Sequence, residues 1–205
     1  METHIGNNVW DEHYRNNAAH RAAGEPNEVM VGEIAGQRPG RALDVGCGVG
    51  DDAIWLASQG WRVKAVDVSQ AALDIATIAA QNANVTVAWV CADISLNAPT
   101  AGGYDLVSVQ YPALRRDPDD RVIHSLLDAV APGGTLLVVG HGPESHEYAR
   151  SQGFEPSEYV EPPDFAVHLD DNWTIEILEV RPRTSPPGSS SHFTHDTILR
   201  AGRHP

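Results

Sequence analysis

The stretch Arg41–Ala57, "RALDVGCGVGDDAIWLA", joins the end of an apolar run, a glycine-rich turn and the start of a helix. Glycines alternate at Gly46, Gly48 and Gly50, two aspartates follow them, and the next apolar residues recur at helical spacing. Glycine lets the backbone approach a ligand closely, and a helix N-terminus offers free N–H groups. The stretch therefore predicts a ligand-binding turn between a strand and a helix.

Strands and helices alternate through the middle of the chain. Strands are expected at 41–45, 61–67, 84–93, 104–111 and 135–141, and helices at 51–59, 70–81 and 119–130. Most of these strands are apolar on both faces, which is typical of a parallel sheet covered by helices on both sides. Two further strands, at 173–183 and 194–202, have no helix between them and predict an antiparallel hairpin. We therefore expect an α/β fold with a doubly wound, seven-stranded, mostly parallel sheet that ends in an antiparallel C-terminal hairpin.

The length of 205 residues fits one domain, residues 1–205. We expect an N-terminal helical cap at 1–39, a ligand-binding core at 40–141 and a C-terminal part at 142–205 that contains the hairpin. The Pro/Ser/Gly-rich stretch 184–191 is interpreted as the hairpin loop rather than as a domain linker, and a short helix is expected at 144–151.

The charge of the chain restricts its partners. Twenty-eight acidic residues against fourteen Lys and Arg give a net charge of −14, which repels a polyphosphate backbone, so no nucleic-acid partner is expected. No apolar run approaches the length of roughly 18 residues that a membrane helix needs, and no secretory signal is visible. Cys47 and Cys91 have no CxxC spacing and are expected to be reduced, so a cytoplasmic protein without membrane contact is predicted.

The residues after the turn indicate what it binds. A dinucleotide-binding turn would carry a third glycine where Asp51 stands, and Asp51 and Asp52 would repel a pyrophosphate at the helix N-terminus. Asp67 ends the second strand about 20 residues after the turn, where an acid accepts hydrogen bonds from ribose hydroxyls. A ribose without phosphate, close to acidic groups, indicates a positively charged nucleoside.

Five motifs carry a resemblance to a known family over about residues 40–141. "LDVGCGVG", "VKAVDVS", "VCADI", "YDLVSVQY" and "APGGTLLVVG" resemble the successive motifs of the class I S-adenosylmethionine-dependent methyltransferases. The layout is most similar to small bacterial single-domain members, including the tellurite-resistance and thiopurine-type relatives. The resemblance implies a Rossmann-like methyltransferase fold, S-adenosyl-L-methionine as cofactor and a small-molecule methyl acceptor.

The resemblance also implies roles for individual residues. Asp44 and the turn would meet the methionine moiety, Asp67 the ribose and Asp93 the adenine amino group. Gln110 would lie near the sulfonium, and aromatic residues of the N-terminal helix would cover the cofactor. The implied cofactor contacts are Trp10, Asp44, Gly46, Cys47, Gly48, Asp67, Val68, Asp93, Ile94 and Gln110.

Two residues are candidates for catalysis, Tyr14 and His141. His141 follows the fifth strand, at the sheet edge where open α/β folds bind ligands, and a histidine pKa suits a general base near neutral pH. The alternative is that His141 caps a loop or contacts solvent. The Asn/Asp-Pro-Pro-Tyr signature for amino acceptors is absent from 110–113, which disfavours nucleobase and glutamine acceptors. No magnesium-binding carboxylate cluster is recognisable, so no metal is expected.

Several alternatives stay open at this point. Trp10 and Tyr14 could be core packing, Asp93 a loop acid, and Cys47 a small turn residue rather than a nucleophile. Asp51 and Asp52 are favourable helix N-terminal acids in any case. A nicotinamide-dependent oxidoreductase would share the fold and Asp67, although Asp51 and the antiparallel hairpin disfavour it. A non-catalytic cofactor-binding protein would share the whole site.

Overall fold

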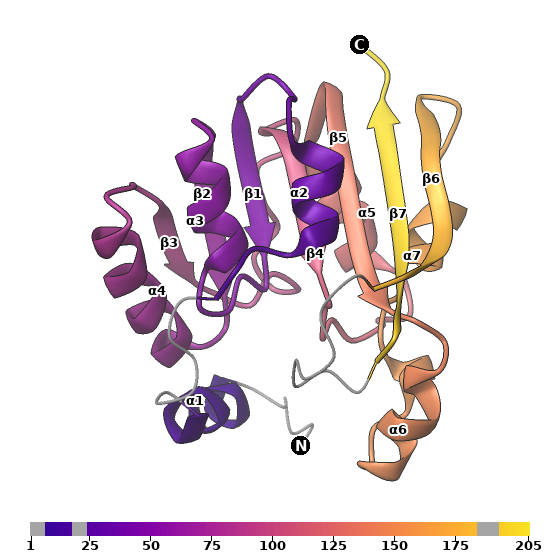
Figure 1. Ribbon diagram of the computed structural model, residues 1–205. Coiled ribbons are helices and arrows are strands. Elements are labelled where there is room, and N and C mark those ends of the chain that lie inside the picture. The colour runs from indigo at the N-terminus through magenta and orange to yellow at the C-terminus, as the bar shows by residue number, and fades with distance from the viewer. Residues whose placement is uncertain (1–6, 18–23, 184–192) are drawn as a thin grey trace. The chain divides into compact units, whose positions relative to one another are not determined.

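The computed structural model describes residues 7–17, 24–183 and 193–205. The chain divides into two compact units, residues 1–97 and 98–205. Their elements are labelled in Figure 1. The expected organisation as a single domain with three parts stays a prediction.

The first unit contains a parallel three-stranded part of the sheet, in the order β3-β2-β1. Its register pairs Val45 with Val66 and Asp67 with Cys91, so the three strands end at the same edge. Helix α3 packs on β1 and β2, and helix α4 packs on β2 and β3. The elements are α1 (Asn7–Asn17), α2 (Glu28–Ile34), β1 (Arg41–Val45), α3 (Asp51–Ser58), β2 (Arg62–Asp67), α4 (Gln70–Asn82) and β3 (Ala88–Cys91).

Local sequence explains where these helices begin. Ser69 caps α4, because its hydroxyl accepts from Ala72 N at 3.2 Å. Helix α2 begins at Glu28, because the side chain of Asn27 accepts from Val29 N at 2.8 Å and caps the helix there.

The second unit contains the strand order β4-β5-β7-β6. Strands β4 and β5 are parallel, whereas β7 is antiparallel to both β5 and β6, so the antiparallel C-terminal strands are confirmed. Stretch 184–191, expected to connect them, lies outside the described residues. The elements are β4 (Tyr104–Gln110), α5 (Arg121–Ala129), β5 (Val130–His141), α6 (Ser145–Ser151), the 3₁₀ helix η2 (Pro156–Glu158), α7 (Pro162–Val167), β6 (Trp173–Pro182) and β7 (His195–Arg203).

Strand β5 is longer than expected. It begins at Val130 rather than at 135, directly after α5 ends at Ala129, and it includes Pro132 and Gly133. The ladder with β4 shifts between the pairs Tyr104–Val130 and Leu106–Thr135, and Gly133 adopts a left-handed φ of 76°. A bulge with a left-handed glycine lets the strand continue past a proline, which the sequence pattern alone reads as a stop.

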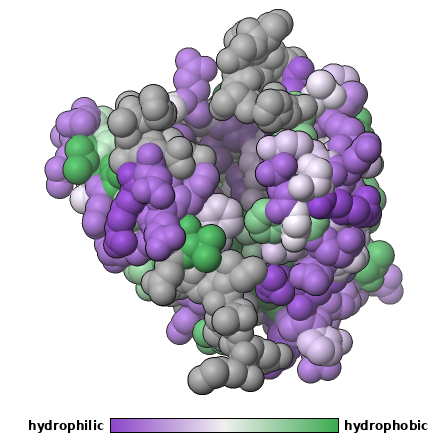
Figure 2. Space-filling view, turned by 90° about the horizontal axis from the view of Figure 1, so that it is seen from below, coloured by the Kyte–Doolittle hydropathy of each residue, from purple (hydrophilic) through white to green (hydrophobic). Residues whose placement is uncertain are grey.

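The fold class expected from the sequence is confirmed: an α/β fold whose seven strands are mostly parallel and end in antiparallel C-terminal strands. Figure 2 shows the protein from below relative to Figure 1, with hydrophilic residues in purple and hydrophobic residues in green. Within the described parts of the chain, no helix has the length and apolar character needed to span a membrane.

Candidate functional site

The glycine-rich turn uses a backbone conformation that other residues rarely adopt. Gly46, Gly48 and Gly50 have φ values of 68°, 53° and 86°. Gly50 also has no room for a side chain, since an added Cβ would lie 2.5 Å from the Trp89 ring and 2.9 Å from Ala76 Cβ. The alternating glycines are thus required by three left-handed backbone conformations and, at Gly50, by the close packing of Trp89 and Ala76.

The turn is fixed to the end of β2. Gly46 N and Cys47 N both donate to the Val66 carbonyl, at 2.8 and 3.1 Å. Asp67 accepts from Gly48 N at Oδ2 and from Ser69 N at Oδ1, both at 2.8 Å. Asp67 therefore has a fixed orientation at the carboxyl end of the strand, and each of its oxygens retains a lone pair for a further donor.

Asp44, at the end of β1, is the least satisfied of these acids. Its side chain is 2% exposed, and Oδ2 is buried without a hydrogen-bond partner. Burial raises the pKa of Asp44 well above its ordinary value, and the nearby carboxylates of Asp52 and Asp67 raise it further. Buried polar groups normally have partners. A positively charged ligand would supply the missing one.

Asp51 and Asp52 do more than begin a helix. Asp51 Oδ1 accepts from Gly24 N at 2.8 Å, and Asp52 Oδ1 accepts from Asn27 N at 2.6 Å. Burial raises the pKa of Asp52 to about 6, although the Asn27 N–H opposes this shift. The two acids therefore hold segment 24–27 against the turn. Sequence reasoning missed this role, because a backbone donor leaves no signature in residue types.

Helix α1 also contacts the turn region. Tyr14 is 9% exposed and packs with Val49 and Ala72, and Trp10 packs against this cluster. A Cβ added to Gly48 would lie 2.7 Å from the Tyr14 hydroxyl. Tyr14 therefore packs in the core beside the turn, and its predicted roles in covering the cofactor and in catalysis stay predictions.

Asp11 fixes α1 in this position. Its Oδ1 accepts from the Ser69 hydroxyl at 2.6 Å and from Ala71 N at 3.1 Å. Sequence reasoning did not single out Asp11, because its partners lie about 60 positions away.

The remaining predicted contacts of the first unit lie close to the same edge. Burial raises the pKa of Cys47 well above its ordinary value, and the negative charges of Asp44 and Asp67 raise it further. The thiol therefore stays protonated, as expected for a small turn residue rather than a nucleophile. Asp93 Oδ1 accepts from Ser95 N at 2.9 Å and from Ser95 Oγ at 2.6 Å, as a loop acid does. Ile94 is buried, and Val68 is half-buried directly after Asp67. Their adenine contacts stay predictions.

In the second unit, Gln110 and Tyr111 stand at the end of β4. Gln110 Nε2 donates to Ser108 Oγ at 3.1 Å, and Gln110 Oε1 is buried without a hydrogen-bond partner. Tyr111 has a left-handed φ of 48°, which is rare for an aromatic residue. Its hydroxyl donates to Asp196 Oδ1 at 3.0 Å. A strained residue inside a polar network is a common mark of a functional site.

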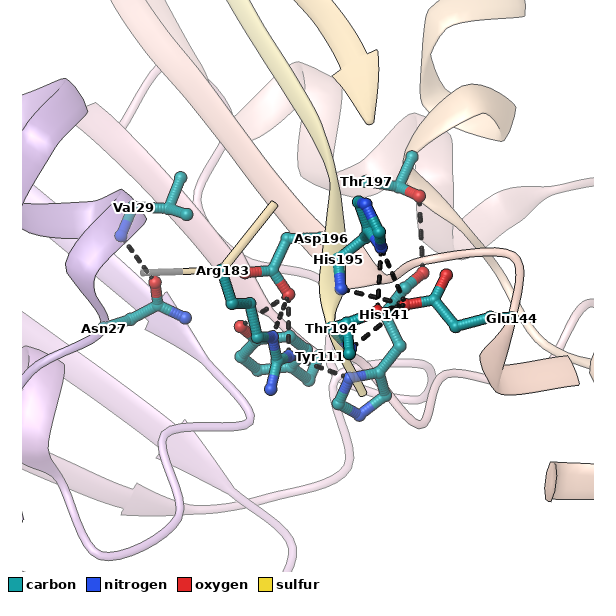
Figure 3. A network of polar contacts seen from close by, with 10 residues as sticks. All are labelled: Asn27, Val29, Tyr111, His141, Glu144, Arg183, Thr194, His195, Asp196 and Thr197. Atoms are coloured by element: carbon teal, nitrogen blue, oxygen red, sulfur yellow. Dashed lines mark hydrogen bonds and ion pairs between the residues drawn. The ribbon is translucent and has the colours of Figure 1, made fainter. Parts of the chain in front are cut away.

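His141 is part of the same network, drawn in Figure 3. Its ring stacks on Tyr111 with 4.5 Å between the centroids, and Arg183 Nη2 donates to His141 Nδ1 at 3.0 Å. Burial, and then the Arg183 charge, lower the pKa of His141 to about 4. This geometry contradicts the expected general base. A guanidinium occupies the lone pair at Nδ1, and in the neutral ring the other nitrogen carries the proton.

Comparison with known proteins gives these sites a context. Residues 42–134 match the family model described as "Methyltransferase domain". The chain is 32% identical over 119 residues to ribosomal RNA small subunit methyltransferase C of Alcanivorax borkumensis, covering 56% of this chain and 36% of that protein. It is 33% identical over 96 residues to ubiquinone biosynthesis O-methyltransferase of Coxiella burnetii, covering 46% and 41%. The chain thus spans less than half the length of these curated relatives.

A solved structure from work on the conversion of a disulfide bond into a thioacetal group during echinomycin biosynthesis has a similar fold. Its TM-score is 0.75 at 23% identity, and the match covers 97% of this chain and 91% of that one. The likeness extends beyond the motif region to both units.

The fold and the turn define an α/β protein with a backbone-fixed aspartate and a buried, unpartnered carboxyl oxygen beside a glycine-rich turn. Over residues 42–134, the chain is similar to methyltransferase domains, in agreement with the resemblance carried by its motifs. S-adenosyl-L-methionine is the cofactor that this similarity implies, and the residues present fit it. Asp44 Oδ2 is buried without a partner, and the cofactor carries two positive groups, an ammonium and a sulfonium, that could pair with a carboxylate there.

Proposed function

We propose that this protein is an S-adenosylmethionine-dependent methyltransferase that acts on a small-molecule acceptor. The unpartnered, buried Oδ2 of Asp44 carries the proposal, because a buried carboxyl group without a partner among other acids is best satisfied by a cationic ligand, which also favours its ionised form. Asp67, already oriented by two backbone N–H groups, supplies the ribose contact. The match of residues 42–134 to the methyltransferase domain model supports the same cofactor.

The contribution of the protein in such a reaction is mainly positioning. The cofactor supplies an activated methyl group on a sulfonium, so the protein must align the acceptor with it in a site that excludes water. In this chain, Asp44, Asp67 and the left-handed turn would hold the cofactor, while Tyr14 and Trp10 of α1 pack beside the turn. His141 is not proposed as a base, because Arg183 donates a hydrogen bond to its Nδ1.

The charge of the chain favours a small acceptor over RNA. The net charge is −14, whereas proteins that bind nucleic acids present basic surfaces. One relative is named for ribosomal RNA and another for ubiquinone, and both matches cover only part of those proteins. We therefore propose a small molecule, and we expect ribosomal RNA not to accept a methyl group from this enzyme.

Calorimetry tests the donor half of the proposal. S-adenosylmethionine and S-adenosylhomocysteine should both bind the wild-type protein. Asp44→Asn keeps the shape of the side chain and removes its charge, so the affinity for S-adenosylmethionine should fall at least about tenfold, or about 1.4 kcal/mol. The control Asp119→Asn removes the same charge from an exposed position and should bind as the wild type does. Absence of binding at about 1 mM ligand in a folded sample would refute the proposal.

A turnover assay separates the enzyme from a non-catalytic cofactor-binding protein. Conversion of S-adenosylmethionine to S-adenosylhomocysteine should depend on an added small-molecule fraction and not on ribosomal RNA. Binding without turnover against a broad acceptor panel would favour the non-catalytic alternative. Reduced nicotinamide cofactors should give no fluorescence change, because Asp51 and Asp52 stand where a pyrophosphate would bind.

A further inference from the structure

The second unit brings four side chains to one edge of its strands. Tyr111 follows β4, His141 ends β5, Arg183 follows β6 and Asp196 stands at the start of β7. His141 and Asp196 are direct register partners. In open α/β folds, ligands bind beyond the carboxyl ends of the parallel strands, where β4 and β5 end. The four residues, hereafter the Tyr111–Asp196 cluster, therefore lie at the edge suited to a ligand.

Within the cluster, Arg183 is held in place by Asp196. Arg183 Nε donates to Asp196 Oδ1 at 2.7 Å, and the two side chains are only 14% and 6% exposed. The Arg183 guanidinium carbon also lies 4.9 Å from the centroid of the Tyr111 ring. A partly buried, hydrogen-bonded and stacked guanidinium has little freedom to turn. Its donor to His141 is therefore fixed in direction.

This contact determines where the proton of His141 is. A guanidinium has only donors and keeps its charge in proteins, so His141 Nδ1 must accept the hydrogen bond. The neutral ring then carries its proton on Nε2, and protonation of Nδ1 would set two donors against each other. Tyr111 and Phe193 contact the ring, with centroids at 4.5 and 4.3 Å, and so fix its plane.

The other charged groups around His141 do not reverse this arrangement. Glu144, before α6, accepts from Thr194 N at 3.2 Å and from His195 N at 2.8 Å. Asp196 is paired with Arg183. The lowered pKa of His141, caused first by burial and then by Arg183, agrees with a ring that stays neutral. In Figure 3 the second ring nitrogen of His141 points away from the network, and no dashed line joins it to the residues drawn.

We propose that His141 is a fixed hydrogen-bond donor that binds a carbonyl oxygen of a small-molecule ligand through Nε2–H, and that Arg183 is the positioning residue that sets this tautomer. The proposal concerns the second unit alone and goes beyond the proposed function, since it names a ligand class for this edge of the strands. An uncharged oxygen fits better than a carboxylate, because the nearby Glu144 adds a second acid to the pair formed by Arg183 and Asp196. The ligand class is thus a small molecule with a ketone, ester or amide oxygen.

Nitrogen NMR of the histidine-labelled protein, without cofactor, tests the tautomer. His141→Gln assigns the signals of this ring among the ten histidines. At pH 7 we expect a protonated Nε2 and an unprotonated Nδ1, and the ring should stay neutral to about pH 5. Arg183→Met should raise the pKa of His141 from about 4 towards its ordinary value of 6.5, while Arg183→Lys keeps a cationic donor and a low pKa.

Titration of the wild-type ring near 6.5, or a proton on Nδ1, would overturn the proposal even if the variants fail to fold. These readouts need neither methyl transfer nor cofactor, so they fail independently of the proposed function.

A pair of matched probes tests the ligand class. Benzamide has a carbonyl oxygen, whereas benzylammonium has a ring of the same size and a cationic donor. Benzamide should shift the Nε2–H signal of His141 in the wild type, and this shift should be lost in Arg183→Met. Equal shifts with both probes, or no shift with benzamide, would overturn the assignment of a carbonyl-bearing ligand.

Discussion

The two units both place carboxylates at the ends of their strands, and they treat the charge in opposite ways. In the first unit, burial raises the pKa of Asp44, Asp52 and Asp67, and the other two acids raise that of Asp44 further. Asp44 Oδ2 also has no hydrogen-bond partner. In the second unit, Asp196 is equally buried but bonds Arg183 and Tyr111. The first arrangement leaves a cation to be supplied from outside, whereas the second is complete within the chain. A buried acid indicates a ligand only when its counterion is missing.

The largest effect is expected at the backbone of the first unit. Gly50→Ala imposes a left-handed φ of 86° on alanine and sets its Cβ 2.5 Å from the Trp89 ring. Strain and overpacking together should lower the free energy of unfolding by about 4 kcal/mol. Urea denaturation measures this change.

Gly36→Ala is the matched control. Its φ of 82° is nearly the same, and nothing lies within 4 Å of the added Cβ. It should cost only the conformational strain, about 1 kcal/mol. Equal losses for the two variants would show that the contact with Trp89 contributes nothing.

The next effect contrasts the two buried acids directly. Asp196→Asn removes the charge that pairs Arg183 and should cost about 3 kcal/mol, because a buried cation loses its counterion. Asp44→Asn replaces a carboxyl group whose pKa is raised well above its ordinary value and whose Oδ2 has no partner, so it should change the unfolding free energy by less than about 1 kcal/mol. Equal losses in urea denaturation would break the distinction drawn between the two units.

The smallest effect is that Asp52 and His141 make the free energy of unfolding change with pH in opposite directions. Asp52 has a folded pKa of about 6 against an ordinary 3.8, so the folded state binds the proton more tightly and stability falls as pH rises through this range. His141 has a folded pKa of about 4 against 6.5, so the unfolded state binds the proton more tightly and stability falls as pH decreases from about 6.5 to 4.

Two variants separate these opposed contributions. Between pH 4 and 7, the titration of Asp52 should lower the free energy of unfolding of the wild type by about 1–2 kcal/mol, and Asp52→Asn should lack this decrease. His141→Gln should remove a gain over the same range. Unfolding free energies of both variants at several pH values check the signs, and slopes that change in the same direction would contradict the burial of one of the two groups.

Much of the first unit could be predicted from its sequence, because its chemistry is local. The glycines of the turn have left-handed backbone conformations, and Ser69 caps the helix that it precedes. Asp67 accepts a hydrogen bond from Gly48 N, only 19 positions earlier in the chain. The roles of Asp51 and Asp11 were missed, because their partners are the backbone of Gly24 and of Ala71. A backbone donor is present at almost every position and gives no pattern to recognise.

The second unit was predictable in topology and not in its cluster. Apolar runs and the hairpin predicted the strands, and strand order brought His141 to the correct edge. The base role failed because the proton of His141 is set by Arg183, which lies 42 positions away and has no motif around it. Residue type predicts what a histidine can do, while its neighbour decides which nitrogen carries the proton.

The position of Asp196 in β7 has a consequence for the order in which the protein folds. The contact between Tyr111 and Asp196 closes 85 positions of chain, and Asp196 is synthesised after every other member of its cluster. Domains form from the N-terminus during synthesis, and distant contacts form late because loop closure costs entropy. The cofactor turn can therefore be in place while β7 is still absent. The Tyr111–Asp196 cluster is complete only once β7 has joined β5, so it marks the last stage of assembly.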